Sequence, residues 1–261
     1  MNTPESVYGK GRSILITGAS SGIGAALAEE IAEYGGDVAL VARREEQLQE
    51  VAQRVRRRGA RPLVLACDVT DLESVRAAGA RIVEVQGPVE VAFLNAGIGE
   101  VVHLPRFDAR KVQRVFEVNI FGVLNWMEAL LPAMIERKSG ILAATSSLAA
   151  ARGLPGASAY SATKAALSAL LDAYRVEARL YGLQITIIEP GFVRTPINEG
   201  AKSRPFLLEV EPAARIILDG VAEGQALIRF PWQMAAAMQV LRHLPNALFD
   251  RVGARLVRRR D

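Results

Sequence analysis

Short apolar segments alternate with longer helical patterns along almost the whole of this 261-residue chain. An apolar run bounded by turn residues is typical of a buried strand, and apolar residues spaced three and four apart are typical of a helix. Parallel strands need a long crossover, usually a helix, so strict alternation predicts a parallel sheet covered by helices on both faces. Strands are expected at 13–17, 37–42, 62–66, 89–94, 141–145, 184–189 and 226–230.

Helices are expected in the intervening segments, at 25–34, 44–58, 108–131 and 158–181, with further helices opening near 70 and 212. Asp108 is expected to cap the helix that follows it. Residues 70–73 form a capping-box pattern that begins with Thr70, and Pro212 is expected as the first residue of its helix. The pattern as a whole predicts one Rossmann-type, doubly wound α/β domain with about seven mostly parallel strands.

The composition excludes several classes of protein. Half of the residues are hydrophobic, which suits one domain with a large core. No apolar run is as long as a membrane span, and residues 1–12 lack the apolar stretch of a signal peptide. A single cysteine, Cys67, cannot form a disulfide framework and fits a reducing, cytoplasmic setting. His103 and His243 are too far apart in the sequence to suggest a metal site, so no metal is expected.

The positive charge is concentrated at the C-terminal end. The chain carries a net charge of +4, and residues 242–261 hold six arginines against Asp250 and Asp261, so that this end alone accounts for +4. The rest of the chain has no net charge, whereas a nucleic-acid-binding domain carries basic residues over its binding face. No nucleic-acid partner is therefore expected. A solvated helical face is the favoured interpretation; a weak peripheral contact with anionic membrane stays open.

A glycine-rich turn follows the first expected strand. Gly18, Gly22 and Gly24 lie where that strand passes into a helix, which is the context that gives such a motif meaning. Gly18 permits the tight turn, Gly22 lets the backbone approach a phosphate, and Gly24 lets the helix pack closely on the strand. The turn is expected to hold a dinucleotide pyrophosphate on backbone N–H groups, together with its neighbours Ser20, Ser21 and Ile23.

The end of the second expected strand bears on cofactor preference. An acidic residue there would accept hydrogen bonds from the adenosine ribose and repel a 2′-phosphate. This chain has Ala42 at that position, followed by Arg43 and Arg44. A guanidinium matches the charge and geometry of a phosphate. The pattern favours NADP(H) over NAD(H), with Arg43 as the phosphate ligand.

Tyr160 and Lys164 stand about 140 residues downstream of the glycine turn, one helical turn apart and on one face. Reduction of a ketone by hydride transfer leaves an alkoxide that needs a proton, and a phenol near its free pKa of about 10 exchanges protons poorly at neutral pH. An ammonium beside it is expected to lower that pKa. Taken alone, the two residues are better explained as an exposed helical pair, and the surrounding motifs decide between the two interpretations.

Together these motifs resemble the short-chain dehydrogenase/reductase family over about residues 12–200. The resemblance implies that Tyr160 is the general acid/base and that Lys164 also hydrogen-bonds the nicotinamide ribose. It implies that Ser147, 13 residues before Tyr160, orients the substrate; Ser146 is the competing candidate. Asn119 is a poor helix former in the middle of an expected helix, and the resemblance implies that it kinks this helix and holds a proton-relaying water.

Three further segments resemble family cofactor contacts. Asp68 and Val69, after the third strand, resemble the pair that flanks the adenine ring. Asn95, Ala96 and Gly97, after the fourth, resemble the segment that supports the sheet beside the cofactor. The resemblance also implies a loop that holds the nicotinamide carboxamide, with Pro190, Gly191, Val193 and Thr195.

The resemblance weakens after about Thr195. Residues 196–211 lie where the family has its substrate lid, and their apolar Phe206, Leu207 and Leu208 suggest an apolar substrate. Residues 12–230 are expected to form the core, and residues 231–261 a helical extension packed on the domain or on another subunit. A helix face in this extension is expected to carry Trp232, Met234, Met238, Leu241 and Leu244. A homo-oligomer is expected, without the usual family tetramer interface being assumed.

The sequence therefore predicts an NADP(H)-dependent oxidoreductase that interconverts an apolar ketone or aldehyde and its alcohol, with tyrosine as the general acid/base. Two alternatives remain. The fold can serve a non-catalytic NADP-binding sensor or scaffold protein, although such a protein has no need for Tyr160. The fold can also serve an epimerase or dehydratase, although those relatives are usually longer and have a different glycine pattern.

Overall fold

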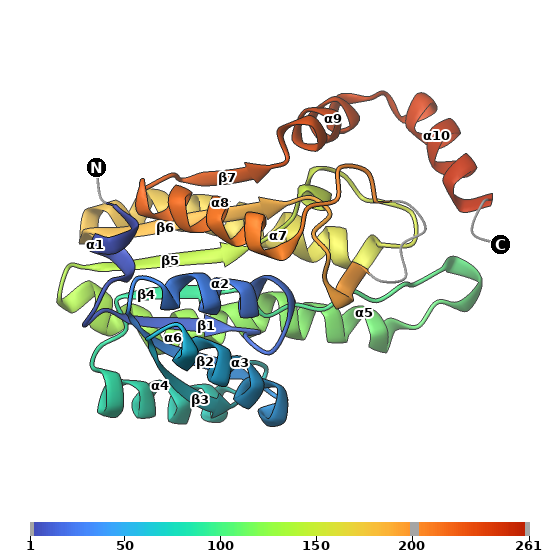
Figure 1. Ribbon diagram of the computed structural model, residues 1–261. Coiled ribbons are helices and arrows are strands. Elements are labelled where there is room, and N and C mark those ends of the chain that lie inside the picture. Colours follow the sequence, from blue (N-terminus) through green and yellow to red (C-terminus); the bar gives the residue numbers. More distant parts are fainter. Residues whose placement is uncertain (1–2, 199–203, 259–261) are drawn as a thin grey trace.

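The computed structural model describes residues 3–198 and 204–258 and shows a seven-stranded sheet (Figure 1). Its strand order is β3-β2-β1-β4-β5-β6-β7, and every neighbouring pair is parallel. The predicted fold class is confirmed, and each predicted strand is present. The strands are β1 (Ser13–Thr17), β2 (Asp37–Ala42), β3 (Arg61–Ala66), β4 (Val91–Leu94), β5 (Gly140–Thr145), β6 (Leu183–Pro190) and β7 (Leu227–Phe230).

Helices join the strands and cover both faces of the sheet (Figure 1). The α-helices are α1 (Pro4–Tyr8), α2 (Gly22–Ala32), α3 (Glu45–Arg57), α4 (Leu72–Gln86), α5 (Ala109–Phe116), α6 (Gly122–Glu136), α7 (Ser158–Ala178), α8 (Val210–Ala222), α9 (Trp232–His243) and α10 (Asn246–Arg258). Shorter helical turns are η1 (Leu104–Arg106), η2 (Glu117–Phe121), η3 (Leu148–Ala151), η4 (Arg179–Tyr181) and η5 (Pro196–Asn198).

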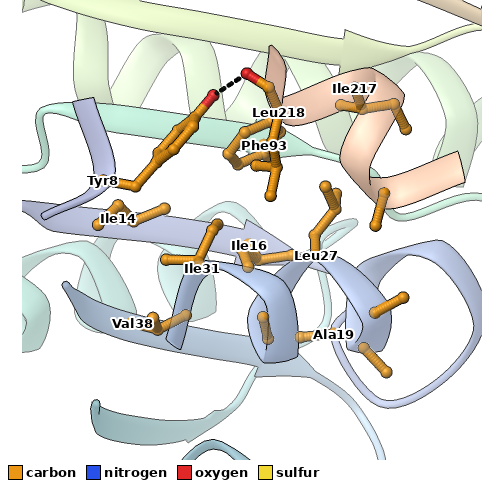
Figure 2. Packing of buried hydrophobic residues seen from close by; sticks show 14 of the residues in the cluster. Tyr8, Ile14, Ile16, Ala19, Leu27, Ile31, Val38, Phe93, Ile217 and Leu218 are labelled. Carbon is orange, nitrogen blue, oxygen red and sulfur yellow. Dashed lines mark hydrogen bonds between the residues drawn. The ribbon is translucent and has the colours of Figure 1, made fainter. Parts of the chain in front are cut away.

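Alternating side chains of the strands supply two hydrophobic cores, one on each face. In β1, Ile14 and Ile16 pack with α2, α3 and α8, whereas Leu15 packs on the other face with α4, α6 and α7. Figure 2 shows part of the first core, where Leu27 and Ile31 of α2 lie against β1. All five residues of β1 are buried, as a central parallel strand requires.

The strand order places a switch point beside β1. β1 pairs with β2 on one side and with β4 on the other. The helical connection that follows β1 and the one that follows β4 therefore lie on opposite faces of the sheet. The chain therefore opens a crevice above the carboxyl ends of these two strands, which is where open parallel sheets bind ligands. The glycine turn after β1 and the segment after β4 both lie at this edge.

Two local predictions about helix starts need correction. The cap of α4 is Asp71, whose carboxylate accepts hydrogen bonds from the backbone N–H groups of Glu73 and Ser74 at 3.0 and 3.3 Å. Thr70 does not cap this helix: it lies one residue before the N-cap, and its hydroxyl donates to Asp68 at 2.9 Å. Helix α8 begins at Val210, so Pro212 is its third residue and not its first.

The long helix predicted from Asp108 is present but is not regular throughout. Asp108 caps α5 by accepting from the N–H of Arg110 at 2.9 Å. A π-helical turn, η2, then interrupts the helix around Asn119 before α6 continues to Glu136. By length and composition the combined helix from Ala109 to Glu136 could cross a membrane, but half of its most apolar window is buried inside the domain, as in the core helix of a globular protein.

The C-terminal extension forms α9 and α10 beyond the end of β7 (Figure 1). The predicted apolar face of α9 is correct for Met238, which is buried, and for Met234, Leu241 and Leu244, which are partly buried. It is wrong for Trp232, which is 73% exposed at the start of the helix. Arg251 is exposed as predicted. The side chains of the arginines at 255 and 258, and residues 259–261 with their arginines, lie outside the described residues.

Candidate active site

A cavity of about 440 Å³ lies above the carboxyl ends of β1, β2, β4, β5 and β6. Every residue predicted to bind the cofactor lines it, except Gly24. Gly24 lies beneath the turn, where a Cβ would collide with the Gly18 carbonyl and so separate α2 from β1. The predicted residues that line the cavity are Gly18, Ser20, Ser21, Gly22, Ile23, Arg43, Asp68, Val69, Asn95, Ala96, Gly97, Tyr160, Lys164, Pro190, Gly191, Val193 and Thr195.

The glycine turn has the geometry of a phosphate cradle. Gly18 and Gly22 have φ of 67° and 57°, a region that favours glycine. A Cβ on Gly18 would lie 2.9 Å from Ala96 Cα, and one on Gly22 would lie 2.9 Å from Thr195 Cγ2. Ser21 stands at the N-cap of α2 but makes no side-chain cap. The first N–H groups of α2, at the positive end of its dipole, are therefore free of a side-chain cap at the cavity, and these features fit the pyrophosphate of a dinucleotide.

Asn95 joins the ends of β1, β4 and β5. Its backbone N–H and that of Ala96 donate to Thr17 Oγ1 at 2.9 and 3.0 Å. Its side-chain amide donates to the Thr17 carbonyl at 3.3 Å and accepts from Thr145 Oγ1 at 3.1 Å. These bonds hold the segment after β4 against the glycine turn, so the cavity wall is fixed by side chains from three strands.

Two arginines follow β2 at the adenosine end of the cavity. Arg43 lies 3.8 Å from the Asp68 carboxylate, and its side chain is 54% exposed. Such a surface pair is worth little and leaves the guanidinium available to a stronger anionic partner. Arg44 crosses to the glycine turn and donates to Ser20 Oγ at 3.0 Å and Ser21 Oγ at 3.2 Å. Sequence reasoning chose Arg43 and missed this contact of Arg44; the signal available to it was the adjacent pair of arginines.

Asn119 is fully buried and ties η2 to its neighbours. Its Oδ1 accepts from the Ile98 N–H at 2.8 Å, and its Nδ2 donates to the Ile98 carbonyl at 3.0 Å and to Thr163 Oγ1 at 3.1 Å. A Cβ placed on Gly97 would lie 3.3 Å from Asn119 Oδ1 and 3.4 Å from Lys164 Nζ. Gly97 thus lets Asn119 and Lys164 approach the same point. Asn119 lies behind the cavity wall and does not line it.

Lys164 is buried on α7, and its Nζ donates to the Thr145 carbonyl at 2.6 Å. Its Nζ lies 5.6 Å from the centre of the Tyr160 ring. Burial disfavours the charged form and lowers the Lys164 pKa from 10.5 to about 8. An ammonium held this way can donate to a ligand in the cavity and to the protein at the same time.

Tyr160 differs from the prediction in the direction of its pKa. Burial, the larger cause, raises the Tyr160 pKa, and a hydrogen bond with Ser147 opposes this. The expected lowering by Lys164 is not what the structure shows. The ammonium is directed to the Thr145 carbonyl, and the Tyr160 pKa is set by the loss of water around the phenol and by Ser147.

Ser147 and Ser146 have different surroundings. The Ser147 hydroxyl lies between Tyr160 and the loop after β6, donating to the Pro190 carbonyl at 3.4 Å and accepting from the Ala149 N–H at 3.1 Å. The Ser146 hydroxyl donates to the Lys164 carbonyl at 2.9 Å and shares a 2.7 Å hydrogen bond with Ser168. Ser146 lines the cavity and Ser147 does not, but Ser147 is hydrogen-bonded to Tyr160, and this contact favours Ser147 as the serine that acts with Tyr160.

The loop after β6 closes the cavity. The Gly191 N–H donates to the Phe230 carbonyl at 2.7 Å, and the Arg194 N–H donates to the Leu208 carbonyl at 2.9 Å. Pro196 and Ile197 continue this wall, which sequence reasoning placed only within a lid at 196–211; residues 199–203 of that range lie outside the described residues. Sequence reasoning also missed the lining residues Ala42, Arg44, Cys67, Ile98, Gly99, Val118 and Thr145. Apart from Arg44, these residues are small or apolar and carry no chemical signal in a sequence.

Metal-binding groups are not gathered in this part of the chain: within residues 3–198 and 204–258, no three His, Cys, Asp or Glu side chains lie where they could share an ion.

Comparison with known proteins identifies relatives over nearly the whole chain. The short chain dehydrogenase family model matches residues 12–205. An uncharacterized oxidoreductase of Myxococcus xanthus is 37% identical over 250 residues, which cover 94% of this chain and 97% of that protein. A fatty acyl-CoA reductase of Acinetobacter baylyi is 33% identical over 243 residues, covering 92% of this chain and 80% of that protein.

Solved structures show the same architecture. Levodione reductase superposes with a TM-score of 0.81 at 27% identity, covering 88% of this chain and 99% of that one. A short chain dehydrogenase/reductase from Burkholderia phymatum was solved in complex with NAD. It superposes with a TM-score of 0.82 at 25% identity, covering 88% of this chain and 92% of that one. With the family model matching most of the chain, these findings show that the protein belongs to the short-chain dehydrogenase/reductase family and is an oxidoreductase acting on CH–OH or carbonyl groups.

Proposed function

We propose that this protein is an NADP(H)-dependent reductase that converts an apolar ketone or aldehyde to its alcohol. The observation that carries the proposal is that Tyr160 and Lys164 line the same cavity as the glycine cradle, with Ser147 hydrogen-bonded to Tyr160. Hydrogen-bond donors thus stand where a carbonyl oxygen would become an alkoxide, and a phosphate site stands where a dinucleotide would be anchored.

A bound nicotinamide supplies or accepts the hydride, and the residues of this chain handle the proton. With its pKa raised by burial, Tyr160 holds its proton at neutral pH and can donate it to the developing alkoxide. Ser147, hydrogen-bonded to Tyr160, can donate to the same oxygen and fix its position. Lys164 provides positive charge beside the phenol and a donor for the cofactor ribose, while Asn119 holds the backbone of Ile98 and the Thr163 hydroxyl in place.

The preference for NADP(H) is supported at the end of β2. Ala42 offers no carboxylate to a ribose, and Arg43 has one exposed ionic partner at 3.8 Å. Arg44, anchored on Ser20 and Ser21, adds a second guanidinium beside it. Two guanidinium groups match the charge of a 2′-phosphate, and we propose that they hold it together.

An apolar substrate is supported by the surroundings of Tyr160 and by one relative. A Cβ on Gly99 would lie 3.4 Å from Ile197 Cγ1 and 3.7 Å from Tyr160 Cδ2, so an isoleucine and the tyrosine ring lie on either side of the same point in the cavity wall. The relative in Acinetobacter baylyi is named for reduction of a fatty acyl-CoA. We propose aliphatic aldehydes and ketones as the substrate class.

The test is the oxidation of NADPH and, in parallel, of NADH against a panel of aliphatic aldehydes and ketones. We expect turnover with NADPH, and with long substrates more than short ones. Preference for NADH would overturn the cofactor proposal, and absence of turnover with every carbonyl would overturn the reaction. In that second case a non-catalytic NADP-binding protein would be favoured, an alternative that nothing in the comparisons supports.

We also propose a cytoplasmic homo-oligomer that binds no nucleic acid. Support comes from the single buried cysteine and from exposed apolar side chains on the α6–α7 side, including Val176 and Leu180, which are 61% and 83% exposed. Weak contact of the basic C-terminal end with anionic membrane is a secondary proposal. Sedimentation analysis tests assembly, and salt-sensitive binding to phosphatidylserine vesicles tests the membrane contact.

A further inference from the structure

Arg152 joins the loop between Ser147 and Tyr160 to the junction of α9 and α10. Its Nη1 donates to the Leu241 carbonyl at 2.9 Å and also to the Leu244 carbonyl, and its Nη2 donates to Asn246 Oδ1 at 2.7 Å. The guanidinium carbon lies 3.9 Å from the centre of the Phe249 ring. Arg152 therefore satisfies carbonyls at the end of α9, where a helix dipole favours a cation, and holds the first turn of α10.

The other end of α9 reaches the loop after β6. A Cβ on Gly191 would lie 2.7 Å from Met234 Sδ and 3.1 Å from Pro231 Cδ. In α10, a Cβ on Gly253 would lie 3.5 Å from Pro155 Cγ, in the same loop as Arg152. Helix α9 therefore spans two backbone segments that meet at Ser147, whose hydroxyl donates to the Pro190 carbonyl: the Pro190–Gly191 turn and the Ser147–Tyr160 loop.

We propose that Arg152 is a positioning residue, which couples α9 and α10 to the loop between Ser147 and Tyr160 and so builds the distal wall of the substrate site. This inference rests on the proposed carbonyl reduction. The described residues of 148–157, α9 and α10 do not line the 440 Å³ cavity, so they lie beyond the groups that hold the reacting carbonyl. In this proposal a small substrate ends at Tyr160 and Ser147, and the distal part of a long one extends over the segment that Arg152 fixes. Loosening this wall therefore costs binding in proportion to substrate length and leaves the cofactor cradle unchanged.

The test compares wild type with Arg152→Ala on propanal and decanal, with NADPH affinity measured separately. We expect kcat/KM for decanal to fall by about tenfold or more, chiefly through KM, and that for propanal to change by less than about threefold. NADPH affinity should stay within about twofold. Arg81→Ala is the matched control, because it removes an arginine whose partner, Glu84, lies on the same exposed face of α4.

Amide hydrogen exchange provides a readout that does not depend on turnover. Arg152→Ala should accelerate exchange in residues 148–157 and in α9 together, and Arg81→Ala should accelerate neither. If wild type reduces no carbonyl, the proposed reaction fails, and this exchange experiment alone decides the coupling. Should Arg152→Ala not fold, Asn246→Ala removes one acceptor and should give the same pattern more weakly.

An equal loss on propanal and decanal, or no loss on either, would overturn the proposal. Accelerated exchange confined to the 148–157 loop, with α9 unchanged, would also overturn it, because Arg152 would then stabilise only its own loop. A length-dependent loss together with joint acceleration of the two segments supports it.

Discussion

Replacing Lys164 with methionine should make the protein more stable near neutral pH while it removes activity. Methionine matches the shape of the buried lysine stem but carries no charge. Only 3% of the lysine surface is exposed, and this burial lowers the pKa of Lys164 from 10.5 to about 8. The charged form is therefore tolerated in the folded protein at a cost in stability, which is expected where a residue serves a site and not the fold.

The size of this cost follows from the pKa. Each pKa unit corresponds to about 1.36 kcal/mol, so the difference between 10.5 and about 8 amounts to about 3 kcal/mol. The substitution also leaves the Thr145 carbonyl without its 2.6 Å partner, which costs roughly 1–3 kcal/mol. The variant should thus be more stable at pH 7 by roughly 0–2 kcal/mol, the difference of these two effects.

The pH dependence is the sharper signature, because the Thr145 contribution is the same at every pH. Below about pH 8 the folded and unfolded wild type both hold the lysine proton, and the full cost is present. Between about pH 8 and 10.5 the unfolded chain binds more protons than the folded one, so wild-type stability rises with pH. The advantage of the variant should therefore decline by about 3 kcal/mol across this range.

Urea unfolding of wild type and Lys164→Met from pH 7 to 10.5 measures this directly. Lys111→Met, which removes an exposed lysine of α5, controls for the loss of one positive charge. If the difference in unfolding free energy between wild type and Lys164→Met stays constant over this pH range, the pKa of Lys164 is not lowered and the reasoning is refuted. A decline that also appears in Lys111→Met would mean that general charge, and not burial, is responsible.

Three further outcomes are expected. Tyr160→Phe keeps the ring but removes the proton donor, so steady-state turnover should fall by roughly 100-fold or more while NADPH affinity, measured by fluorescence, stays near wild type; near-normal turnover would exclude Tyr160 as the acid/base. Arg43→Ala should weaken NADPH binding by about 1.5–3 kcal/mol and leave NADH binding unchanged, and equal effects on both cofactors in calorimetry would contradict a 2′-phosphate contact. Truncation after Phe230 removes the helices that Arg152 and Gly191 contact, so the shortened protein should aggregate or melt at lower temperature; a soluble, equally stable and active product would show that the extension is not structural.

The sequence was sufficient for the fold class because its signals are local and repeated. Each strand is a short apolar run flanked by turn residues, and such runs bury themselves on both faces of a parallel sheet wherever they occur. The spacing of Gly18, Gly22 and Gly24 after a strand, and of Tyr160 and Lys164 along a helix, likewise depends only on neighbouring residues. For this reason the cavity of the structure is lined by the cofactor residues that the motifs predicted, apart from Gly24.

Features that depend on contacts between distant segments were decided only by the tertiary structure. The choice between Ser146 and Ser147 depended on contacts with α7: the Ser146 hydroxyl bonds the Lys164 carbonyl and Ser168, whereas Ser147 bonds Tyr160. The reach of Arg44 to the glycine turn required the packing of α3 beside α2.

The Tyr160 pKa shows most clearly which properties follow from sequence spacing and which depend on the tertiary structure. The sequence predicted an ammonium one helical turn away, and that spacing is correct, but the sign of the effect depends on how much water reaches the phenol and on where the ammonium is directed. Burial depends on the whole fold, and the Lys164 hydrogen bond goes to β5, a strand that ends 15 residues before Tyr160. Sequence spacing determines which groups can meet, whereas their solvation and their hydrogen-bond partners, and hence their chemistry, are set by segments that only the folded chain brings together.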